Sequence, residues 1–350
     1  MSKTSASSNA PIRFAIAGLN HGHVDGWFRR PARGDMQLVG IAEPQTALHD
    51  KFVAKHSIDH GLLHPNLGAM LDTLKPAAVM AFGSTFDHLA VVQACAPRGV
   101  HVMVEKPLAV SGEHAAQIAA LARTHGIHVL TNYETTWYAS NHEAYRLAHD
   151  ARTVGDLRKV VVNDGHWGPK EIGCAPEFLE WLTDPVLNGG GAIMDFGCYG
   201  ANLITWLMDG VAPLTVTAVT QRIKPDLYPK VDDEATIVLT YPHMQGVIHG
   251  SWCWPWHRKD MEIYGATGMV HAVDRVTLHL RDSLNAAERA QTLAPRPAPL
   301  DDVFAFFGAV LRGEVTPGED DLSGLKNNLT VMRILDAARE SARLQCTVTM

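Results

Sequence analysis

The sequence has few cysteines, no long apolar run and no concentration of basic residues. Its five cysteines are widely spaced and form no CxxC pair, so we expect reduced thiols in a cytoplasmic protein. No apolar stretch is long enough to span a bilayer. The formal net charge is −7 and Lys and Arg are scattered, which disfavours nucleic acid and an anionic membrane surface as partners. The first ten residues, "MSKTSASSNA", lack the apolar core of a signal peptide and predict a flexible tail over residues 1–10.

What the chain does contain is an alternation of short apolar runs and helical segments over residues 11–135. The apolar runs predict strands buried on both faces of a parallel sheet, at residues 13–18, 37–43, 77–82, 100–105 and 127–132. Helical segments lie between them, at residues 88–99 and 111–126. This order predicts an α/β fold that begins with a Rossmann-type, doubly wound parallel sheet.

Residues 136–350 show a different order and spacing of predicted elements. A predicted helix at residues 138–151 precedes closely spaced strands, at residues 157–167, 214–223, 234–242, 245–254 and 259–273. Helices at 300–311 and 322–344 and a strand at 346–350 end the chain. The pattern predicts a C-terminal α+β domain with a large open, mostly antiparallel sheet. A crevice between two such domains is a common ligand site.

The stretch "AGLNHGHVDG" follows the first predicted strand, where a dinucleotide-binding domain has its glycine-rich turn. If Gly18 is the first glycine of G-x-G-x-x-G, Asn20 and His23 occupy the second and third positions. Asn adopts a left-handed backbone more readily than most residues, and Gly22 could replace His23 in close helix packing. The turn by itself leaves two interpretations open, a dinucleotide site and a plain strand–helix turn.

The second strand ends in "IAEP", about 20 residues beyond the turn. Glu43 is placed there to accept hydrogen bonds from ribose hydroxyls. Its charge would repel a 2′-phosphate, and no arginine follows in "PQTA", so NAD is favoured over NADP. The alternative is that Glu43 only ends a strand at the surface.

Two further motifs carry chemistry. "VEKPL" lies at the carboxyl end of a predicted strand, the edge where open α/β sheets bind ligands, and a proline follows its Lys106. "NGGGAIMDFGCYGAN" predicts a helix with Asp195, Tyr199 and Asn202 on one face. The alternatives are a solvated lysine paired with Glu105, and the polar stripe of an ordinary half-exposed helix.

In this order and spacing, the motifs resemble the Gfo/Idh/MocA oxidoreductases, a family that includes glucose-fructose oxidoreductase, inositol dehydrogenase and dihydrodiol dehydrogenase. The resemblance runs from "RFAIAGLNHGH" through "GVHVMVEKPLAV" and "GGGAIMDFGCYGAN" to the strands that follow "HGSWCWP". It implies a Rossmann domain and a second domain whose sheet commonly forms a subunit interface. We therefore expect a homodimer or homotetramer.

The resemblance implies catalytic roles for Lys106, Asp195 and Tyr199. The implied reaction is hydride transfer between NAD, with NADP less favoured, and a secondary alcohol or ketone of a sugar, polyol or related cyclic compound. We expect Tyr199 to move the hydroxyl proton, and Lys106 to lower the pKa of its phenol. Asp195 would orient the substrate or Lys106. The expected cofactor-binding residues are Gly18, Asn20, His21, Gly22, His23, Glu43, His88, Glu105 and Lys106.

Candidate substrate contacts are Asn132, His166 and Asn202, with surface or strand-end roles as the alternative. The tryptophans of "SWCWPWH" alternate, so on a strand they would share one face. There they could stack on a sugar ring or fill a sheet or subunit interface.

Three other functions fit parts of the sequence. An NAD-dependent glycosidase would use the same catalytic residues and release a sugar without net NADH. A non-catalytic regulator that binds a dinucleotide or sugar would explain the altered turn, but not Lys106, Asp195 and Tyr199. A metalloenzyme is suggested by the 19 histidines. Because no carboxylate or cysteine pattern completes sets such as His21 with His23, we predict no metal site.

Overall fold

The first sheet of the protein is parallel and six-stranded, as the apolar runs predict. The computed structural model describes residues 10–350, so the tail predicted over residues 1–10 lies almost wholly outside the described residues. The strand order is β3-β2-β1-β4-β5-β6, the doubly wound arrangement. The strands are β1 (Ile12–Ala17), β2 (Met36–Ala42), β3 (Leu63–His64), β4 (Ala78–Ala81), β5 (His101–Glu105) and β6 (Val129–Asn132). The sequence prediction missed only β3, which is too short to give a periodic signal.

Helices lie against both faces of this sheet. They are α1 (Asp25–Arg29), α2 (Thr46–His56), α3 (Leu67–Leu74), α4 (His88–Cys95) and α5 (Gly112–His125). The predicted ends of α5 are confirmed, because Ser111 accepts from the backbone N of His114 at 3.2 Å and Gly126 has φ +64°. Helix α1 has only five residues, since Arg30 precedes a proline and adopts extended backbone.

The second sheet has nine strands in the order β14-β13-β12-β11-β7-β10-β9-β8-β15. Only β7 and β10 pair in parallel, so the sheet is mostly antiparallel, as predicted. The bounds are β7 (Leu157–Gly165), β8 (Thr215–Gln221), β9 (Glu234–Thr240), β10 (Gln245–Ser251), β11 (Arg258–Gly265), β12 (Met269–Ala272), β13 (Thr277–Arg281), β14 (Arg289–Thr292) and β15 (Val348–Thr349). The sequence prediction missed β13 and β14, and β14 is wholly exposed and carries no apolar alternation.

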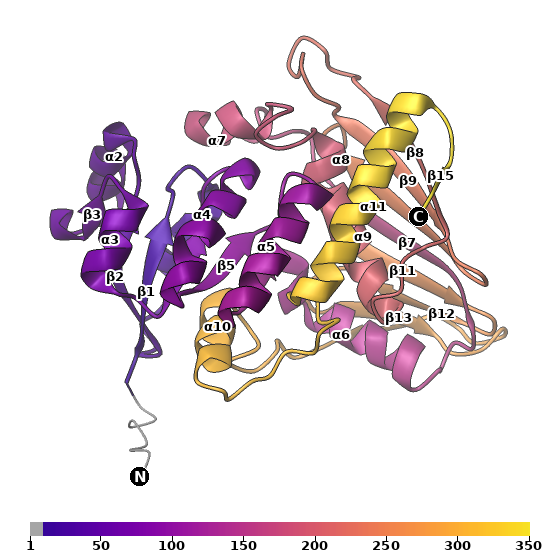
Figure 1. Cartoon of the computed structure of the whole chain (residues 1–350). Coiled ribbons are helices and arrows are strands. Elements are labelled where there is room, and N and C mark those ends of the chain that lie inside the picture. The colour runs from indigo at the N-terminus through magenta and orange to yellow at the C-terminus, as the bar shows by residue number, and fades with distance from the viewer. Residues whose placement is uncertain (1–9) are drawn as a thin grey trace.

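Helices cover one face of the second sheet and leave the other open (Figure 1). The covering helices are α8 (Ala192–Asp195), α9 (Gly197–Leu207) and α11 (Leu325–Leu344). Along β9, Ile237 and Leu239 are buried beneath them, while Val238 points to the other face and is half-buried. The remaining helices are α6 (Ala139–Tyr145), which a π-helical turn continues to Asp150, and α7 (Pro176–Leu182). No helix within residues 10–350 is long and apolar enough to cross a membrane.

One helix from the end of the chain belongs to the core of the first sheet. Helix α10 (Val303–Leu311) lies beside that sheet although it is close to the C-terminus (Figure 1). Phe306 and Phe307 share a hydrophobic cluster with Phe14 and Ile16 of β1. The domain boundary predicted at residue 135 therefore places α10 in the second domain, although its side chains pack against the first sheet.

Candidate active site

The chain turns sharply where β1 ends, at Gly18. Gly18 has φ +87°, and a Cβ atom there would lie 2.6 Å from the backbone N of Gly83 at the end of β4. The positive φ and the close approach of the two loops both require glycine. The first position of the predicted motif therefore has a structural reason to be glycine.

The rest of the turn differs from the expectation. Asn20 is not among the described non-glycine residues with positive φ, so it does not use the left-handed backbone that asparagine tolerates. Within the described chain, a Cβ atom at Gly22 would meet no atom within 4 Å, so Gly22 does not take over close helix packing from His23. The reason is the shortness of α1, which brings no long helix against the sheet.

A segment of the second domain covers this turn. The indole of Trp181, on α7, donates a hydrogen bond to the backbone O of Asn20 at 3.2 Å. The ring of Phe178, also on α7, lies 5.0 Å from the ring of His21 between centroids. The turn thus lies at the junction of the two domains, which the sequence could not indicate.

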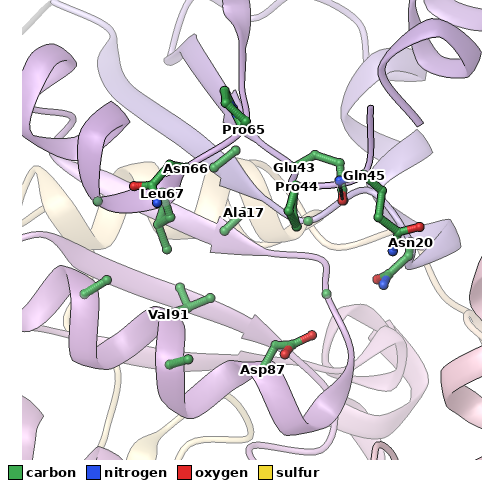
Figure 2. Close-up of a pocket in the computed structure, with 16 residues that line it drawn as sticks. Ala17, Asn20, Glu43, Pro44, Gln45, Pro65, Asn66, Leu67, Asp87 and Val91 are labelled. Atoms are coloured by element: carbon green, nitrogen blue, oxygen red, sulfur yellow. Dashed lines mark hydrogen bonds between the residues drawn. The ribbon is translucent and has the colours of Figure 1, made fainter. Parts of the chain in front are cut away.

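Beside the turn lies a cavity of about 410 Å³. Figure 2 shows residues 43–45, residues 65–67 and helix α4 around this hollow. The lining includes two carboxylates, Glu43 and Asp87, and no Lys or Arg of the described chain. Such a lining fits an uncharged base and ribose better than a ribose that carries a 2′-phosphate.

Glu43 is buried at the edge of this cavity and is not the surface residue of the alternative interpretation. One carboxylate oxygen accepts from the backbone N of Leu19 and the other from that of Gln45, each at 2.8 Å. Burial raises the pKa of Glu43 despite both hydrogen bonds. Glu43 therefore holds the turn in place, and each oxygen keeps a lone pair for a further donor.

A hydrogen-bonded chain connects the turn to the ends of β5 and β6. His23 Nδ1 lies 3.0 Å from Glu105 Oε2, and the amide of Asn132 donates to Glu105 Oε1 at 2.7 Å. The indole of Trp137 donates to Asn132 Oδ1 at 3.0 Å. Burial by itself would raise the pKa of Glu105, but His23 outweighs it and lowers that pKa to about 2. Asn132, a predicted substrate contact, is thus engaged in positioning Glu105.

The ligand atoms of His21, His23 and Glu105 lie within 4.8 Å of one another, so the structure supplies the carboxylate that the sequence pattern lacked. The hydrogen bonds do not suit a metal, however. His21 Nδ1 accepts from the backbone N of His23 at 3.2 Å, and burial lowers the pKa of His21 well below its usual value. The neutral ring then carries its proton on Nε2, where a metal would need a lone pair. Nε2 is a buried donor without a partner among residues 10–350, as suits a ligand oxygen.

His88 supports the segment that carries Lys106. Its Nδ1 lies 3.2 Å from the backbone O of Leu108, and the ring is buried. Burial lowers the pKa of His88, so the ring is neutral. His88 does not line the 410 Å³ cavity.

Lys106 and Asp195 form a buried ion pair between the domains. The Lys106 ammonium donates to the Asp195 carboxylate and, at 2.9 Å, to its backbone O. Burial would lower the pKa of Lys106, but Asp195 outweighs it and raises that pKa. The indole of Trp252 donates to the other carboxylate oxygen at 2.9 Å. Trp252 lies beyond the end of β10, so the alternating tryptophans are not on a strand and the shared face considered for them does not arise.

Tyr199 lies next to this ion pair, but its phenol oxygen accepts a hydrogen bond from a different lysine. Lys259, on β11, donates to the phenol oxygen at 3.3 Å and also pairs with Glu134. Burial raises the pKa of Tyr199 well above its usual value, and nearby carboxylates act in the same direction. The expectation that Lys106 lowers this pKa is therefore wrong, because the Lys106 ammonium is held by Asp195. Sequence reasoning missed Lys259 and Glu134.

Asp164 and His166 lie two positions apart where β7 ends at Gly165. Both carboxylate oxygens of Asp164 are buried and have no hydrogen-bond partner in the described part of the chain, and burial raises its pKa well above its usual value. His166 packs edge-on against Phe196, and burial lowers its pKa to about 4. Sequence reasoning named His166 as a candidate substrate contact but missed Asp164, two positions before it.

Asn202 does not belong to the site. Its amide donates to the backbone O of Leu322 at 2.8 Å, in a buried polar cluster beneath α11. The predicted stripe assumed one helix, but the helix breaks at Phe196 into α8, which ends at Asp195, and α9, which carries both Tyr199 and Asn202. Asn202 lies nearly one turn beyond Tyr199, and its fully buried amide is bonded to the chain before α11 and not directed to the site.

These residues fit a dinucleotide. The 410 Å³ cavity lies at the carboxyl edge of the sheet, and the turn beside it carries two buried polar atoms without a partner in the described chain, Asn20 Oδ1 and His21 Nε2. Glu43 lies at the end of this edge where a Rossmann domain would hold the base and ribose, and Lys106 lies at the far end of the same edge. In a bound dinucleotide, the groups that would hold it are thus the turn, Glu43 and the ends of β4 and β5.

Two family models match the chain. The model described as an oxidoreductase family with an NAD-binding Rossmann fold matches residues 12–133, and that of the GFO/IDH/MocA C-terminal domain matches residues 142–271. Together they cover the first sheet and most of the second.

Curated proteins and solved structures are similar over long regions. A trans-1,2-dihydrobenzene-1,2-diol dehydrogenase of Sus scrofa is 28% identical over 245 residues, which are 69% of this chain and 67% of that protein. The match to the enzyme of the same name from Macaca fascicularis spans 60% of the Macaca protein. A scyllo-inositol 2-dehydrogenase (NADP(+)) of Bacillus subtilis is 23% identical over 94% of this chain and 96% of its own. The solved structure of an inositol dehydrogenase homolog from Azotobacter vinelandii, complexed with NAD+, has a TM-score of 0.82 at 19% identity and covers 100% of both chains. That last likeness concerns the fold alone.

Proposed function

This chain belongs to the GFO/IDH/MocA family of NAD(P)-binding oxidoreductases, and on that footing we propose that it is an NAD-dependent dehydrogenase or reductase. The proposed substrate is a secondary alcohol, or the matching ketone, of a sugar, polyol or related cyclic compound. The observation that carries the proposal is the buried Lys106–Asp195 pair beside Tyr199, at the carboxyl edge of the first sheet. The names of the relatives, which describe diol and inositol dehydrogenases, support this substrate class.

Each catalytic side chain has a role that its contacts support. When bound, a nicotinamide cofactor would supply the chemistry of hydride transfer. Tyr199 is a neutral phenol at physiological pH, so it can give its proton to a carbonyl oxygen in reduction. In oxidation it must first lose that proton, and the phenolate then takes one from the substrate hydroxyl. Two of the three N–H groups of Lys106 donate to Asp195, and the third is available to a substrate oxygen. Asp195, fixed by Trp252, orients Lys106.

The charges around the site favour an uncharged substrate. Lys106 is balanced by Asp195, and Lys259 by Glu134. Burial raises the pKa of Asp164 and so favours the neutral form of its carboxyl. A neutral polyol can hydrogen-bond to such groups without leaving a buried charge unpaired.

NADH should bind more tightly than NADPH, by about tenfold or more, because the cavity at Glu43 offers no cation to a 2′-phosphate. The measurement is a titration of the purified protein with each nucleotide, followed by energy transfer from tryptophan to nicotinamide. Trp181, which contacts the turn, provides a nearby donor. Equal affinities would contradict the assignment of Glu43, and binding of neither nucleotide would contradict the proposed function.

Assays of NAD+ reduction with inositols, cyclic diols and aldoses then define the substrate. A glycoside that is cleaved without net NADH would instead identify the glycosidase alternative, because that reaction returns the hydride within each turnover.

We propose that the protein forms a homodimer or homotetramer through the open face of the second sheet. Val238, Val247 and Val161 are cross-strand neighbours on that face, and all three are half-buried. The double substitution Val238→Lys, Val247→Lys should yield monomers in sedimentation velocity, because it places two charges in an apolar contact. Val186→Lys, at an exposed valine outside the sheet, is the control and should leave assembly unchanged. A monomeric wild-type protein would overturn the proposal.

A further inference from the structure

Two lysines flank the ring of Tyr199, and they make different contacts. Lys106 Nζ lies 5.2 Å from the ring centroid, and its hydrogen bonds go to Asp195. Lys259 Nζ lies 4.5 Å from the centroid and 3.3 Å from the phenol oxygen. Only Lys259 thus has a hydrogen bond to the atom that would exchange a proton with substrate.

The direction of that hydrogen bond is fixed. An ammonium group has no acceptor, so Lys259 donates and the phenol oxygen accepts. The hydroxyl hydrogen of Tyr199 must then point away from Lys259, where it is free to meet a substrate oxygen. The same contact would stabilise the negative charge that remains on the phenol oxygen once this proton has left.

Glu134 extends the contact toward solvent. Its carboxylate pairs with Lys259 and accepts from the hydroxyl of Tyr138 at 2.8 Å. The side chain of Lys259 is 8% exposed, whereas that of Glu134 is 39% exposed. Glu134 also lines a cavity of about 340 Å³ that His23 and other residues border. A continuous path therefore joins a buried phenol to water through two side chains.

The other titratable groups around Tyr199 do not replace Lys259. Asp164 is the register partner of Lys259 across β7 and β11, but it has no hydrogen bond within the described chain, and burial favours its neutral form. Asp195 is occupied by Lys106 and Trp252. Tyr133, Cys198 and His166 are buried neutral groups, since burial raises the pKa of the first two and lowers that of the third.

We propose that Lys259 is the positioning residue that controls the protonation of Tyr199, and that Glu134 connects this pair to solvent. The assignment rests on the proposed dehydrogenase function, in which Tyr199 is the acid and base. In ketone reduction, the substrate carbonyl carbon receives hydride while the Tyr199 O–H bond breaks and its proton forms a new bond to the carbonyl oxygen. Lys259 gives a proton to the phenolate, and water at Glu134 returns a proton to the Lys259 amine. In alcohol oxidation each proton moves the opposite way.

The deciding experiment measures the ionisation of residue 199 without cofactor or substrate. A ring-fluorinated tyrosine, whose phenol is more acidic than that of tyrosine, is placed at position 199 of the full chain and titrated by fluorine NMR. Lys259→Met should raise the titration midpoint by about 1–3 pH units, because it removes the cation nearest the phenol oxygen. Lys259→Arg, which keeps the charge, should leave the midpoint within about 0.5 pH unit of wild type.

The matched comparison is the double variant Lys106→Met, Asp195→Asn, which removes the neighbouring ion pair and leaves the net charge unchanged. It should shift the midpoint by less than about 0.5 pH unit. A larger shift in this variant than in Lys259→Met, or no shift in Lys259→Met, would overturn the proposal.

Kinetics provide a second test. Lys259→Ala should lower kcat by about 10²-fold with KM within a few-fold, and added methylammonium should restore part of the rate. A kcat near that of wild type, or a loss that methylammonium does not restore, would overturn the role of Lys259. A wild-type protein that oxidises no polyol would overturn the proposed function, while the fluorine titration would still decide whether Lys259 governs Tyr199.

Discussion

Replacing Lys106 by methionine should lower kcat for polyol oxidation by about 10²–10⁴-fold, while the Kd for NADH changes by only a few-fold. Lys106 lies at the end of the sheet edge away from the 410 Å³ cavity, so in the proposed function its loss would remove a contact to the reacting oxygen and few contacts to the nucleotide. Steady-state kinetics and the NADH titration measure the two quantities separately. A variant with more than about a tenth of the wild-type kcat would contradict the catalytic role of Lys106.

The same substitution should also destabilise the fold, by about 3–5 kcal/mol, because it leaves the buried carboxylate of Asp195 without its cation. The double variant Lys106→Met, Asp195→Asn removes both charges and should recover most of that stability. It should remain inactive, because the ammonium is still missing. Urea unfolding of the two variants therefore separates a loss of catalysis from a loss of folding.

Replacing Gly18 by alanine should reduce the free energy of unfolding by more than about 3 kcal/mol and weaken NADH binding strongly. The added Cβ meets two obstacles, the φ of +87° and the backbone of Gly83 at 2.6 Å. The loops after β1 and β4 would have to separate, and the 410 Å³ cavity lies beside both. Urea unfolding and the NADH titration are the measurements.

Gly34 offers a matched control for that substitution. It also has a positive φ, +70°, but within the described chain a Cβ atom there would meet nothing within 4 Å. Gly34→Ala should cost only about 1–2 kcal/mol and leave NADH binding unchanged. Equal effects of the two substitutions would show that backbone strain, and not the contact between the two loops, explains the result.

The sequence predicted the parts of this protein that follow from local patterns. Buried apolar runs located the five longer strands of the first sheet, and the position of Lys106 after one of them brought it to the ligand edge. The motif that carries Asp195 and Tyr199 also predicted Lys106's buried partner, since Asp195 pairs with Lys106 and Tyr199 lies beside them. The spacing argument assumed one continuous helix, but the helix is broken at Phe196, and Asn202, on the same helix as Tyr199, packs against the chain before α11.

The parts that the sequence did not predict depend on how distant segments approach one another. Lys259 and Glu134 are 125 positions apart, and the register of β11 against β7 brings the lysine to the phenol. Nothing in the stretch "HRKDMEIYG" distinguishes this lysine from a solvated one on a strand. The same holds for Trp181, whose contact with the turn requires the second domain to be in place.

The position of α10 also has a consequence for synthesis. One face of the first sheet is closed by Phe304, Phe306 and Phe307, which the ribosome makes only after strands β7 to β14 of the second sheet. Until then, apolar side chains of β1 such as Phe14 and Ile16 lack their cover. The N-terminal domain is thus the first to be started and among the last to be completed. Through most of translation, the uncovered face of its sheet is an exposed apolar surface of the kind that chaperones bind.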